Sequence, residues 1–383
     1  MHVAINAWFW DRPDTGSGQY VRRLVAALGE AAPHLRVTLV APRGVAVEPP
    51  GASVSVVEAP LRGRGHWGKL RFEQQSFPRI AGEIGADVAH VPYWGAPLSS
   101  PAPIVVTIHD LIPLVLPEYR GGMLGRLYTS LVAATARGAA AVITDSEASQ
   151  ADILARLELP AERVHAIPLA AGEAYHPRPG QPAHAAVREK YGLPPEFVLY
   201  LGGYDVRKNV HTLLKAYTYV RDGLGDAYPL VLAGRLPQGS SARFTDVERL
   251  ISAMSLGDAV RTIGWVDDGD APALYRMAAC FAFPSRYEGF GLPVLEAMSC
   301  GTPVVAADAA SLPEIVGDAG FLVPPDDARQ MAGAILATLN QGEVAAQMRE
   351  RGLQRAGQFS WARTAEQTLR VYERAALHAP REA

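Results

Sequence analysis

Short apolar runs, each followed by a glycine turn and a helical pattern, recur along this chain. The first run, Val3–Ala7, leads through Thr15–Gly18 into apolar residues spaced as on one face of a helix. The same order returns at Phe197–Leu201, followed by Gly202-Gly203 and a helical pattern over Val210–Val220. Strand, turn and helix in this order build βαβ units, which form parallel sheets with helices on both faces. The sequence therefore predicts an α/β fold with two doubly wound domains.

A segment without helical or strand periodicity separates the two halves. Residues 171–182 carry three prolines and two glycines, a composition that is typical of linkers. Because the chain has 383 residues, each half is long enough to bury its own core. We predict one domain over 1–170 and a second over 183–360. A last amphipathic helix is expected from Trp361 to about residue 378, with Ser360 as its N-cap.

The composition excludes some classes of protein. A formal net charge of −3 argues against general nucleic-acid binding. The two cysteines, Cys280 and Cys300, are expected to be small packing residues, which suits a reducing cytoplasm. The N-terminus lacks the pattern of a signal peptide, and no run of about 18 uncharged apolar residues occurs. We expect a cytoplasmic protein that can contact a membrane only peripherally.

The stretch from Cys280 to Gly301 combines a strand, a glycine loop and a helix start. Cys280–Phe283 is too short for a helix and is predicted to be a buried strand. Gly289 and Gly291 then let the backbone turn tightly beside a ligand. A helix is expected from Pro293 to Cys300, since proline suits the first turn. The unpaired N–H groups and the dipole at that helix start favour a bound anion.

Two carboxylates accompany this anion site. Glu288 lies in the loop before the helix, and Glu296 lies about one turn beyond Pro293. A carboxylate can accept hydrogen bonds from two neighbouring hydroxyls, as on a ribose or a sugar ring. Donors for phosphate and acceptors for hydroxyls in one loop suit a nucleotide sugar. The alternative is that Glu288 is a turn residue and Glu296 a solvated helix residue.

Positive charges precede the helix that begins near Val210. Arg207 and Lys208 stand before its N-terminus, where the helix dipole disfavours positive charge. A bound diphosphate would explain their position, and the alternative is a pair of solvated charges. In the first half, Gly16 and Gly18 could bring backbone amides near a diphosphate, with a merely tight turn as the alternative.

A further candidate follows the β-branched run Ile104–Ile108, which is predicted to be a buried parallel strand. It delivers His109 and Asp110 at its carboxyl end, where open α/β sheets bind ligands. The alternative for His109 is a structural histidine that caps the strand. Leu111–Glu118 contains two prolines and is expected to be an irregular apolar loop.

A basic segment over 62–71 carries four fixed positive charges, a histidine and a tryptophan, and it lacks acidic residues. Such a segment can meet an acidic lipid surface or a phosphorylated acceptor. A peripheral membrane contact would be made by Arg62, Arg64, Trp67, Lys69 and Arg71. The alternative is a flexible solvated loop with one packed tryptophan.

Three segments resemble one enzyme family. Glu288 to Glu296 is similar to the E-x7-E signature of retaining glycosyltransferases of the GT-B fold, family 4, also called group 1. GGYDVRKNV resembles the Arg/Lys diphosphate site of that family, and IHDLIPLVLPEYR resembles bacterial polysaccharide mannosyltransferases. The resemblance implies two Rossmann-like domains that face each other across a cleft, with residues 361–383 crossing back to the first domain.

The resemblance also implies roles for individual residues. His109 would contact the donor sugar, Arg207 and Lys208 the leaving phosphates, and Glu288 the ring hydroxyls; these four form the implied catalytic set. The implied donor-binding residues are Gly16, Gly18, Gly203, Arg207, Lys208, Gly264, Trp265, Glu288, Gly289, Phe290, Gly291, Leu292 and Glu296. A D-x-D metal motif is lacking where this fold would use one, so we predict catalysis without a metal or a cofactor.

The implied activity is transfer of a sugar from a nucleotide diphosphate to a hydroxyl of a glycan or lipid-linked acceptor in cell-surface polysaccharide synthesis. GDP-mannose is the expected donor, and UDP- or dTDP-sugars are alternatives. A non-catalytic nucleotide-sugar-binding protein and a GT-B epimerase fit less well, because the Arg-Lys pair and E-x7-E suit a transferase. A Rossmann oxidoreductase is disfavoured, because the first turn, T-G-S-G, lacks the G-x-G-x-x-G spacing.

Overall fold

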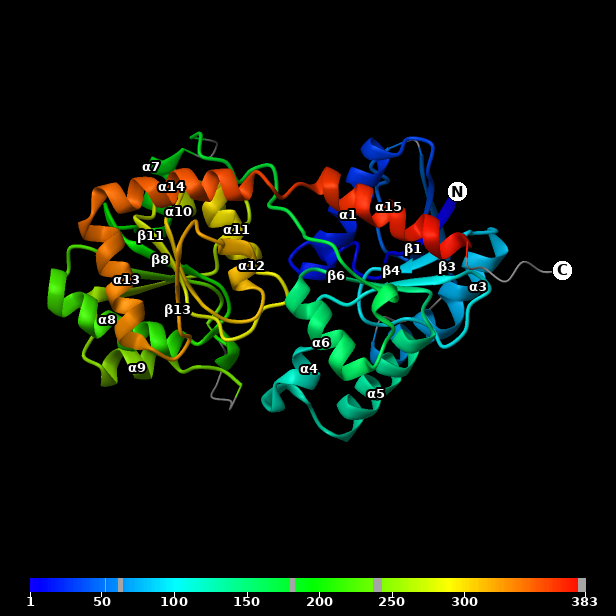
Figure 1. Ribbon diagram of the computed structural model, residues 1–383, viewed down its shortest axis with the longest axis horizontal. Coiled ribbons are helices and arrows are strands. Elements are labelled where there is room, and N and C mark those ends of the chain that lie inside the picture. The colour runs from blue at the N-terminus through cyan, green and yellow to red at the C-terminus, as the bar shows by residue number, and fades with distance from the viewer. Residues whose placement is uncertain (52, 61–64, 180–182, 237–242, 378–383) are drawn as a thin grey trace. The chain divides into compact units, whose positions relative to one another are not determined.

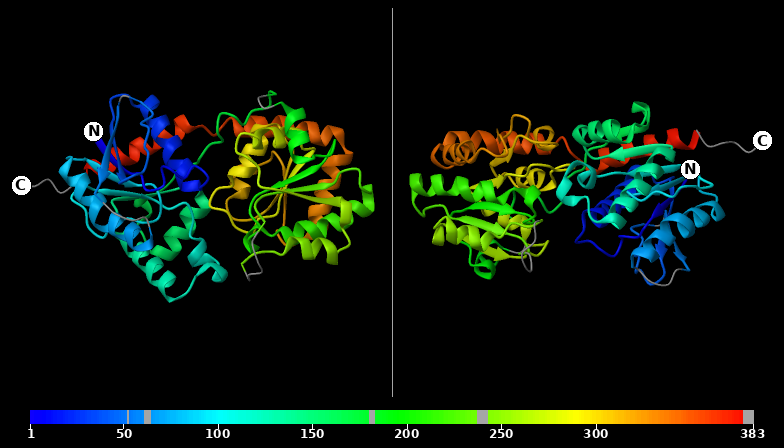
Figure 2. Two further views of the ribbon diagram at one scale, coloured as in Figure 1. Left: turned by 180° about the vertical axis from the view of Figure 1, so that it is seen from behind. Right: turned by 90° about the horizontal axis from the view of Figure 1, so that it is seen from below.

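The computed structural model contains two compact units (Figure 1). It describes residues 1–51, 53–60, 65–179, 183–236 and 243–377. The first unit comprises Met1–Leu169 and the chain from Ser360 onward, and the second comprises Ala170–Phe359. Each unit has one parallel sheet, and helices cover both faces of each sheet (Figure 2). The predicted α/β class with two Rossmann-like domains is confirmed.

The first unit is built on a seven-stranded sheet in the order β3-β2-β1-β4-β5-β6-β7. Its strands are β1 (His2–Asn6), β2 (Arg36–Pro42), β3 (Val54–Ala59), β4 (Val88–Val91), β5 (Ile104–Thr107), β6 (Ala141–Thr144) and β7 (Val164–Ala166). Every residue of β1, β4, β5 and β6 is buried, which explains their continuous apolar runs. The strand order reverses direction between β1 and β4, and ligands bind at such switch points in open α/β sheets.

Helices cover this sheet, and the last one returns from the end of the chain. They are α1 (Gly16–Ala31), α2 (His66–Arg71), η1 (Phe72–Ser76, π-helical), α3 (Phe77–Glu83), α4 (Ile112–Val115), η2 (Pro117–Tyr119), α5 (Met123–Gly138), α6 (Glu147–Leu157), η3 (Ala161–Arg163) and α15 (Trp361–Leu377). Helix α15 packs against α1 (Figure 1). The predicted cap of α15 is confirmed, since Ser360 Oγ accepts from the amide of Arg363, and Ser146 Oγ caps α6 in the same way.

The second unit repeats this plan with six strands in the order β10-β9-β8-β11-β12-β13. They are β8 (Val198–Leu201), β9 (Leu230–Ala233), β10 (Val260–Gly264), β11 (Cys280–Phe283), β12 (Val304–Ala307) and β13 (Phe321–Val323). The helices are α7 (His184–Tyr191), η4 (Val206–Lys208), α8 (Val210–Leu224), α9 (Val247–Ala253), η5 (Gly257–Ala259), α10 (Ala271–Met277), α11 (Leu292–Ser299), α12 (Leu312–Val316), α13 (Ala328–Asn340) and α14 (Gly342–Ala356). The switch point of this sheet lies between β8 and β11.

Both cysteines are buried in the second unit, as predicted. Cys280 lies in β11 and Cys300 follows α11. Burial raises the pKa of each thiol to about 12, so neither is a thiolate at neutral pH. They are packing residues.

One prediction about local structure is wrong. Residues 111–118 are not an irregular loop, because they form α4 and η2. Both prolines of this segment lie in first turns, where the missing N–H removes no helical hydrogen bond. The prediction treated both prolines as helix breakers and overlooked that proline is compatible with the first turn of a helix.

The basic segment does not match the alternative of a flexible loop with a packed tryptophan, because α2 is a helix and Trp67 is 82% exposed. The ammonium group of Lys69 turns inward and forms an ion pair with buried Glu73, contrary to the predicted lipid contact. Arg62 and Arg64 lie outside the described residues. Among the helices that the structure describes, none is long and apolar enough to cross a membrane.

Candidate active site

Three charged side chains meet where β8 and β11 end. Arg207 Nη1 lies 2.8 Å from Glu288 Oε2, and Lys208 Nζ lies 2.7 Å from Glu288 Oε1. The cations belong to η4 after β8, whereas Glu288 belongs to the loop after β11. Only 11–12% of each side chain is exposed. The group therefore lies at the switch point of the second sheet, where this fold binds ligands.

Burial and charge act in opposite directions on Glu288. Burial raises the pKa of its carboxyl. The positive charges of Lys208 and Arg207 lower this pKa by more than burial raises it. The hydroxyl of Ser285, which donates to Oε1 at 2.6 Å, also lowers the pKa. The net pKa lies below the usual value, so the carboxylate is ionised at neutral pH. The Glu288 carboxylate neutralises part of the positive charge of Arg207 and Lys208. The sequence suggested separate ligands for these groups and did not indicate that they contact one another.

Asn209 fixes the junction between η4 and α8. Its φ of 54° is left-handed, a conformation that asparagine tolerates better than most residues. Its amide donates to the carbonyl oxygens of Pro284 at 3.2 Å and Pro325 at 2.6 Å. The backbone amide of Arg286 also donates to the Arg207 carbonyl at 2.9 Å. These bonds join the loops after β8 and β11. Sequence reasoning missed Asn209, although an asparagine between a turn and a helix was an available signal.

The glycine loop before α11 is shaped by its own packing. Gly291 has a φ of 113° as the residue before the helix, a value that L side chains rarely adopt. The hydroxyl of Ser311 donates to the carbonyl oxygens of Phe290 at 2.6 Å and Glu288 at 3.0 Å. The Phe290 ring packs edge-on against Phe359 with centroids 6.0 Å apart. Sequence reasoning did not identify Ser311 as a residue that holds this loop. Gly289 lies in the loop, and Leu292 begins α11 one residue before the predicted start.

Other predicted residues of the second unit lie along the same sheet edge. Glu296 is 9% exposed in α11 and accepts a hydrogen bond from the Tyr275 hydroxyl at 3.3 Å, so it is not a solvated helix residue. Gly203 is the second residue after the end of β8. Gly264 ends β10, two strands from β8, and Trp265 follows it, 48% exposed beneath the Arg235 guanidinium. Their contacts with a nucleotide stay predictions.

In the first unit, His109 pairs with a buried carboxylate. Its Nδ1 lies 2.8 Å from Asp145 Oδ2, and the Asp145 side chain is 4% exposed. Burial lowers the pKa of the imidazole, but Asp145 more than offsets this, and the net pKa is raised. A hydrogen bond with the Pro92 backbone also contributes to raising this pKa. Contact of His109 with a donor sugar stays a prediction.

A buried chain of hydrogen bonds lies behind His109. The hydroxyl of Tyr372 on α15 lies 2.6 Å from His90 Nδ1, and His90 Nε2 lies 2.8 Å from Thr107 Oγ1. The Tyr20 hydroxyl lies 3.2 Å from the same Thr107 Oγ1. Burial lowers the His90 pKa to about 3, so its neutral ring donates from one nitrogen and accepts at the other. The Tyr20 ring packs edge-on against His109 at 4.8 Å. Local sequence patterns gave no signal for this chain, since it joins distant segments.

The first glycine turn has a structural explanation. Thr15 Oγ1 caps α1 by accepting from the amide of Gly18 at 3.2 Å. A Cβ at Gly18 would overlap the carbonyl oxygen of Arg12, whereas the space beside Gly16 is open. These facts favour the tight-turn alternative for Gly18. Contact of either glycine with a diphosphate stays a prediction.

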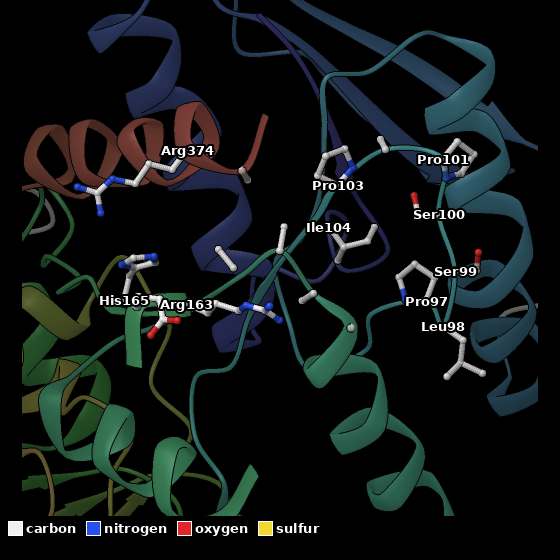
Figure 3. A pocket seen from close by; sticks show the side chains of 17 residues that line it. Pro97, Leu98, Ser99, Ser100, Pro101, Pro103, Ile104, Arg163, His165 and Arg374 are labelled. Carbon is white, nitrogen blue, oxygen red and sulfur yellow. The ribbon is translucent and has the colours of Figure 1, made fainter. Parts of the chain in front are cut away.

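A cavity of about 750 Å³ lies at the opposite, amino-terminal edge of the first sheet (Figure 3). Arg163 and His165 border it near β7, and Arg374 borders it from α15. None of the predicted site residues lines it. Within the described part of the chain, no group of three or more His, Cys, Asp or Glu side chains could hold a metal ion. The prediction of metal-free catalysis is not tested by that observation.

Comparisons with known proteins bear on the whole chain. The family model described as Glycosyl transferases group 1 matches residues 185–355, and that described as Glycosyltransferase Family 4 matches 15–170. O-antigen chain mannosyltransferase B of Escherichia coli is 36% identical over 271 residues, which cover 70% of each protein. The serotype-specific mannosyltransferase WbdA of Escherichia coli is 31% identical over 70% of this chain, which spans only 33% of WbdA.

Solved structures show the same fold. Sucrose-phosphate synthase from Thermosynechococcus elongatus has a TM-score of 0.74 at 25% identity, covering 97% of this chain and 98% of that one. The Anabaena protein HepE, solved with UDP and glucose, has a TM-score of 0.71 at 20% identity, covering 97% of this chain and 99% of its own. Fold neighbours and sequence relatives agree with the predicted enzyme class. This chain belongs to the group 1 glycosyltransferases of family 4.

Proposed function

We propose that this enzyme transfers mannose from GDP-mannose to a hydroxyl of a glycan or lipid-linked acceptor in cell-surface polysaccharide synthesis, with retention at the anomeric carbon. The mannose assignment is carried by the relative of 36% identity, which is an O-antigen mannosyltransferase. The assignment of the donor site rests on the cluster of Arg207, Lys208 and Glu288 at the switch point of the second sheet.

In the proposed reaction, the bond between the anomeric carbon and the β-phosphate oxygen breaks and its electron pair moves to that oxygen. Arg207 and Lys208 stabilise the growing negative charge. The acceptor oxygen bonds to the anomeric carbon and its proton passes to the departing phosphate. Because the diphosphate takes the place of the Glu288 carboxylate beside the two cations, Glu288 becomes available to accept from ring hydroxyls of the sugar. The role proposed for His109 is contact with the donor sugar.

We propose that the reaction needs no metal ion. Two fixed cations that are 11–12% exposed can balance a diphosphate in a site with little water. The test is activity after removal of metals, which is described in the Discussion.

A screen of nucleotides tests the donor. GDP, UDP, dTDP and ADP, with their mannose or glucose conjugates, are compared by thermal shift and calorimetry. Stabilisation grows with ligand concentration over Kd, so the cognate nucleotide should stand out. A selective response to UDP or dTDP would keep the enzyme class and discard GDP-mannose; HepE, whose complex holds UDP, makes UDP the first rival. No response to any nucleotide would contradict the donor site.

We also propose that the first unit makes a peripheral contact with the inner face of the membrane. The support is Trp67, which is 82% exposed on α2, and the neighbouring exposed Arg71. Co-sedimentation with vesicles of phosphatidylglycerol and phosphatidylcholine should fall when Trp67→Ala is introduced. Equal binding of the variant, or no binding by the unchanged protein, would contradict this contact.

A further inference from the structure

The switch point of the first sheet carries polar side chains that the proposed mechanism does not use. The strand order reverses between β1 and β4, so a ligand crevice is expected at their carboxyl ends. Asn6 ends β1, Phe9 follows it, and Tyr93 follows β4. Lys69 and Glu73 reach these residues from α2 and η1, where a π-helical turn replaces the α-helix. Such π-helical turns are frequent at functional sites.

Lys69 is held by a carboxylate, a hydroxyl and three aromatic rings. Its Nζ lies 3.2 Å from Glu73 Oε1 and donates to the Tyr128 hydroxyl at 3.0 Å. The ring centroids of Tyr93, Tyr128 and Phe9 lie 4.9, 5.3 and 5.5 Å from the same nitrogen. The Lys69 side chain is 23% exposed. Since an ammonium has three donors, one N–H remains for a ligand on the open side.

Several buried polar side chains lie close to Lys69 and interact with one another. Burial raises the pKa of the Glu73 carboxyl, although hydrogen bonds with Lys69, Tyr93 and Tyr128 act against burial, and the Tyr93 hydroxyl also interacts with Asn6. Asn6, Glu73 and Tyr93 are 0–4% exposed. These interactions fix the position of Glu73 and, through the ion pair, the position of the Lys69 ammonium group. A Cβ at Gly95 would lie 2.7 Å from Glu73 Oε1, so a glycine leaves room for the carboxylate.

The chemistry of the open side points to an uncharged sugar. Phe9 and Tyr128 are partly exposed and can pack against the C–H face of a sugar ring. Lys69 supplies a donor for a hydroxyl, but Glu73 cancels its charge, so a phosphate gains little net attraction from the pair. The position suits an acceptor, because β4 neighbours β5 in the sheet and the Pro92 carbonyl, just before Tyr93, contributes to raising the His109 pKa.

We propose that Phe9, Lys69 and Tyr128 bind the terminal sugar of an uncharged glycan acceptor. Glu73 and Tyr93 are positioning residues, because they are too deeply buried to touch the acceptor and act by holding Lys69 in place. This inference rests on the proposed function, since it names the acceptor class of the same reaction.

The test compares reaction of the donor with use of the acceptor. Tyr128→Phe removes one hydroxyl from the site. The double variant Lys69→Met with Glu73→Gln removes the ion pair without leaving a buried charge alone. The control is Glu83→Gln, which breaks an Arg79–Glu83 pair of the same i, i+4 spacing whose side chains are 55–56% exposed. Each variant is assayed for donor hydrolysis without acceptor and for transfer to methyl α-mannoside, an uncharged probe, or to mannose 1-phosphate, a charged one.

The double variant should raise the KM for methyl α-mannoside by about tenfold or more, and Tyr128→Phe by less, because hydrogen bonds to the acceptor are lost. Donor hydrolysis, the donor KM and the melting temperature should stay near those of the unchanged enzyme. A merely structural role would instead lower the melting temperature and slow both reactions together.

Three results would overturn the inference: an unchanged KM for methyl α-mannoside in the double variant, a preference for mannose 1-phosphate, or no use of methyl α-mannoside while the donor is hydrolysed. Absence of donor hydrolysis and of nucleotide binding in the unchanged enzyme would instead refute the proposed function. Saturation-transfer NMR with methyl α-mannoside alone measures the acceptor site without the donor, so the two failures are distinguishable. Loss of the signal in the double variant, with retention in Glu83→Gln, is the expected result.

Discussion

Glu288 and a diphosphate should compete for the same two cations, so Glu288→Gln should separate binding from turnover. Glu288 now lies 2.8 Å from Arg207 and 2.7 Å from Lys208, and a diphosphate must replace these contacts. Glutamine keeps the shape but removes the charge. A hydrogen bond between charged groups contributes about 1.5–3 kcal/mol, so removing competition for one such bond should tighten GDP binding by about 10- to 100-fold. Turnover should fall by about 100-fold or more, because the sugar hydroxyls lose their acceptor.

The measurements are calorimetric titration with GDP and steady-state transfer rates. Asp318→Asn is the matched control, because it removes one negative charge from the same unit at a carboxylate that is 87% exposed and 4.0 Å from Arg351. It should change neither quantity. Weaker GDP binding by folded Glu288→Gln, or normal turnover, would refute the competition between carboxylate and diphosphate.

Three further outcomes are expected. Because the folded-state pKa of His109 is raised, its pair with Asp145 stabilises the protein below about pH 6.5, and this contribution is lost as the pH rises through the raised pKa. Asp145→Asn should lower the His109 pKa in an NMR titration, and an unchanged pKa would contradict that cause. Gly18→Ala should reduce the free energy of unfolding in urea by about 1–3 kcal/mol, because its Cβ overlaps Arg12, whereas Gly16→Ala should be nearly neutral. EDTA should leave transfer activity intact, and a loss that Mn²⁺ restores would overturn the metal-free reaction.

Local structure could be predicted from the sequence because the signals are local. Cys280–Phe283 is a strand with the predicted bounds, since a short apolar run between turn residues leaves few other structures. Ser360 caps α15 as predicted, because a cap depends on residues within one turn. The same reasoning failed at residues 111–118, where proline counted as a helix breaker although it occupied a first turn.

The sequence by itself determined the two α/β units and placed Arg207, Lys208, Glu288 and His109 at strand ends, because periodicity and turn chemistry report on each segment alone. Only the tertiary structure decided which side chains meet. Lys208 and Glu288 pair across 80 residues, and His90 meets Tyr372 across 282. Such contacts depend on the order in which strands join the sheet, and local patterns do not encode that order. For the same physical reason, the inward turn of Lys69 toward Glu73 became visible only in the fold.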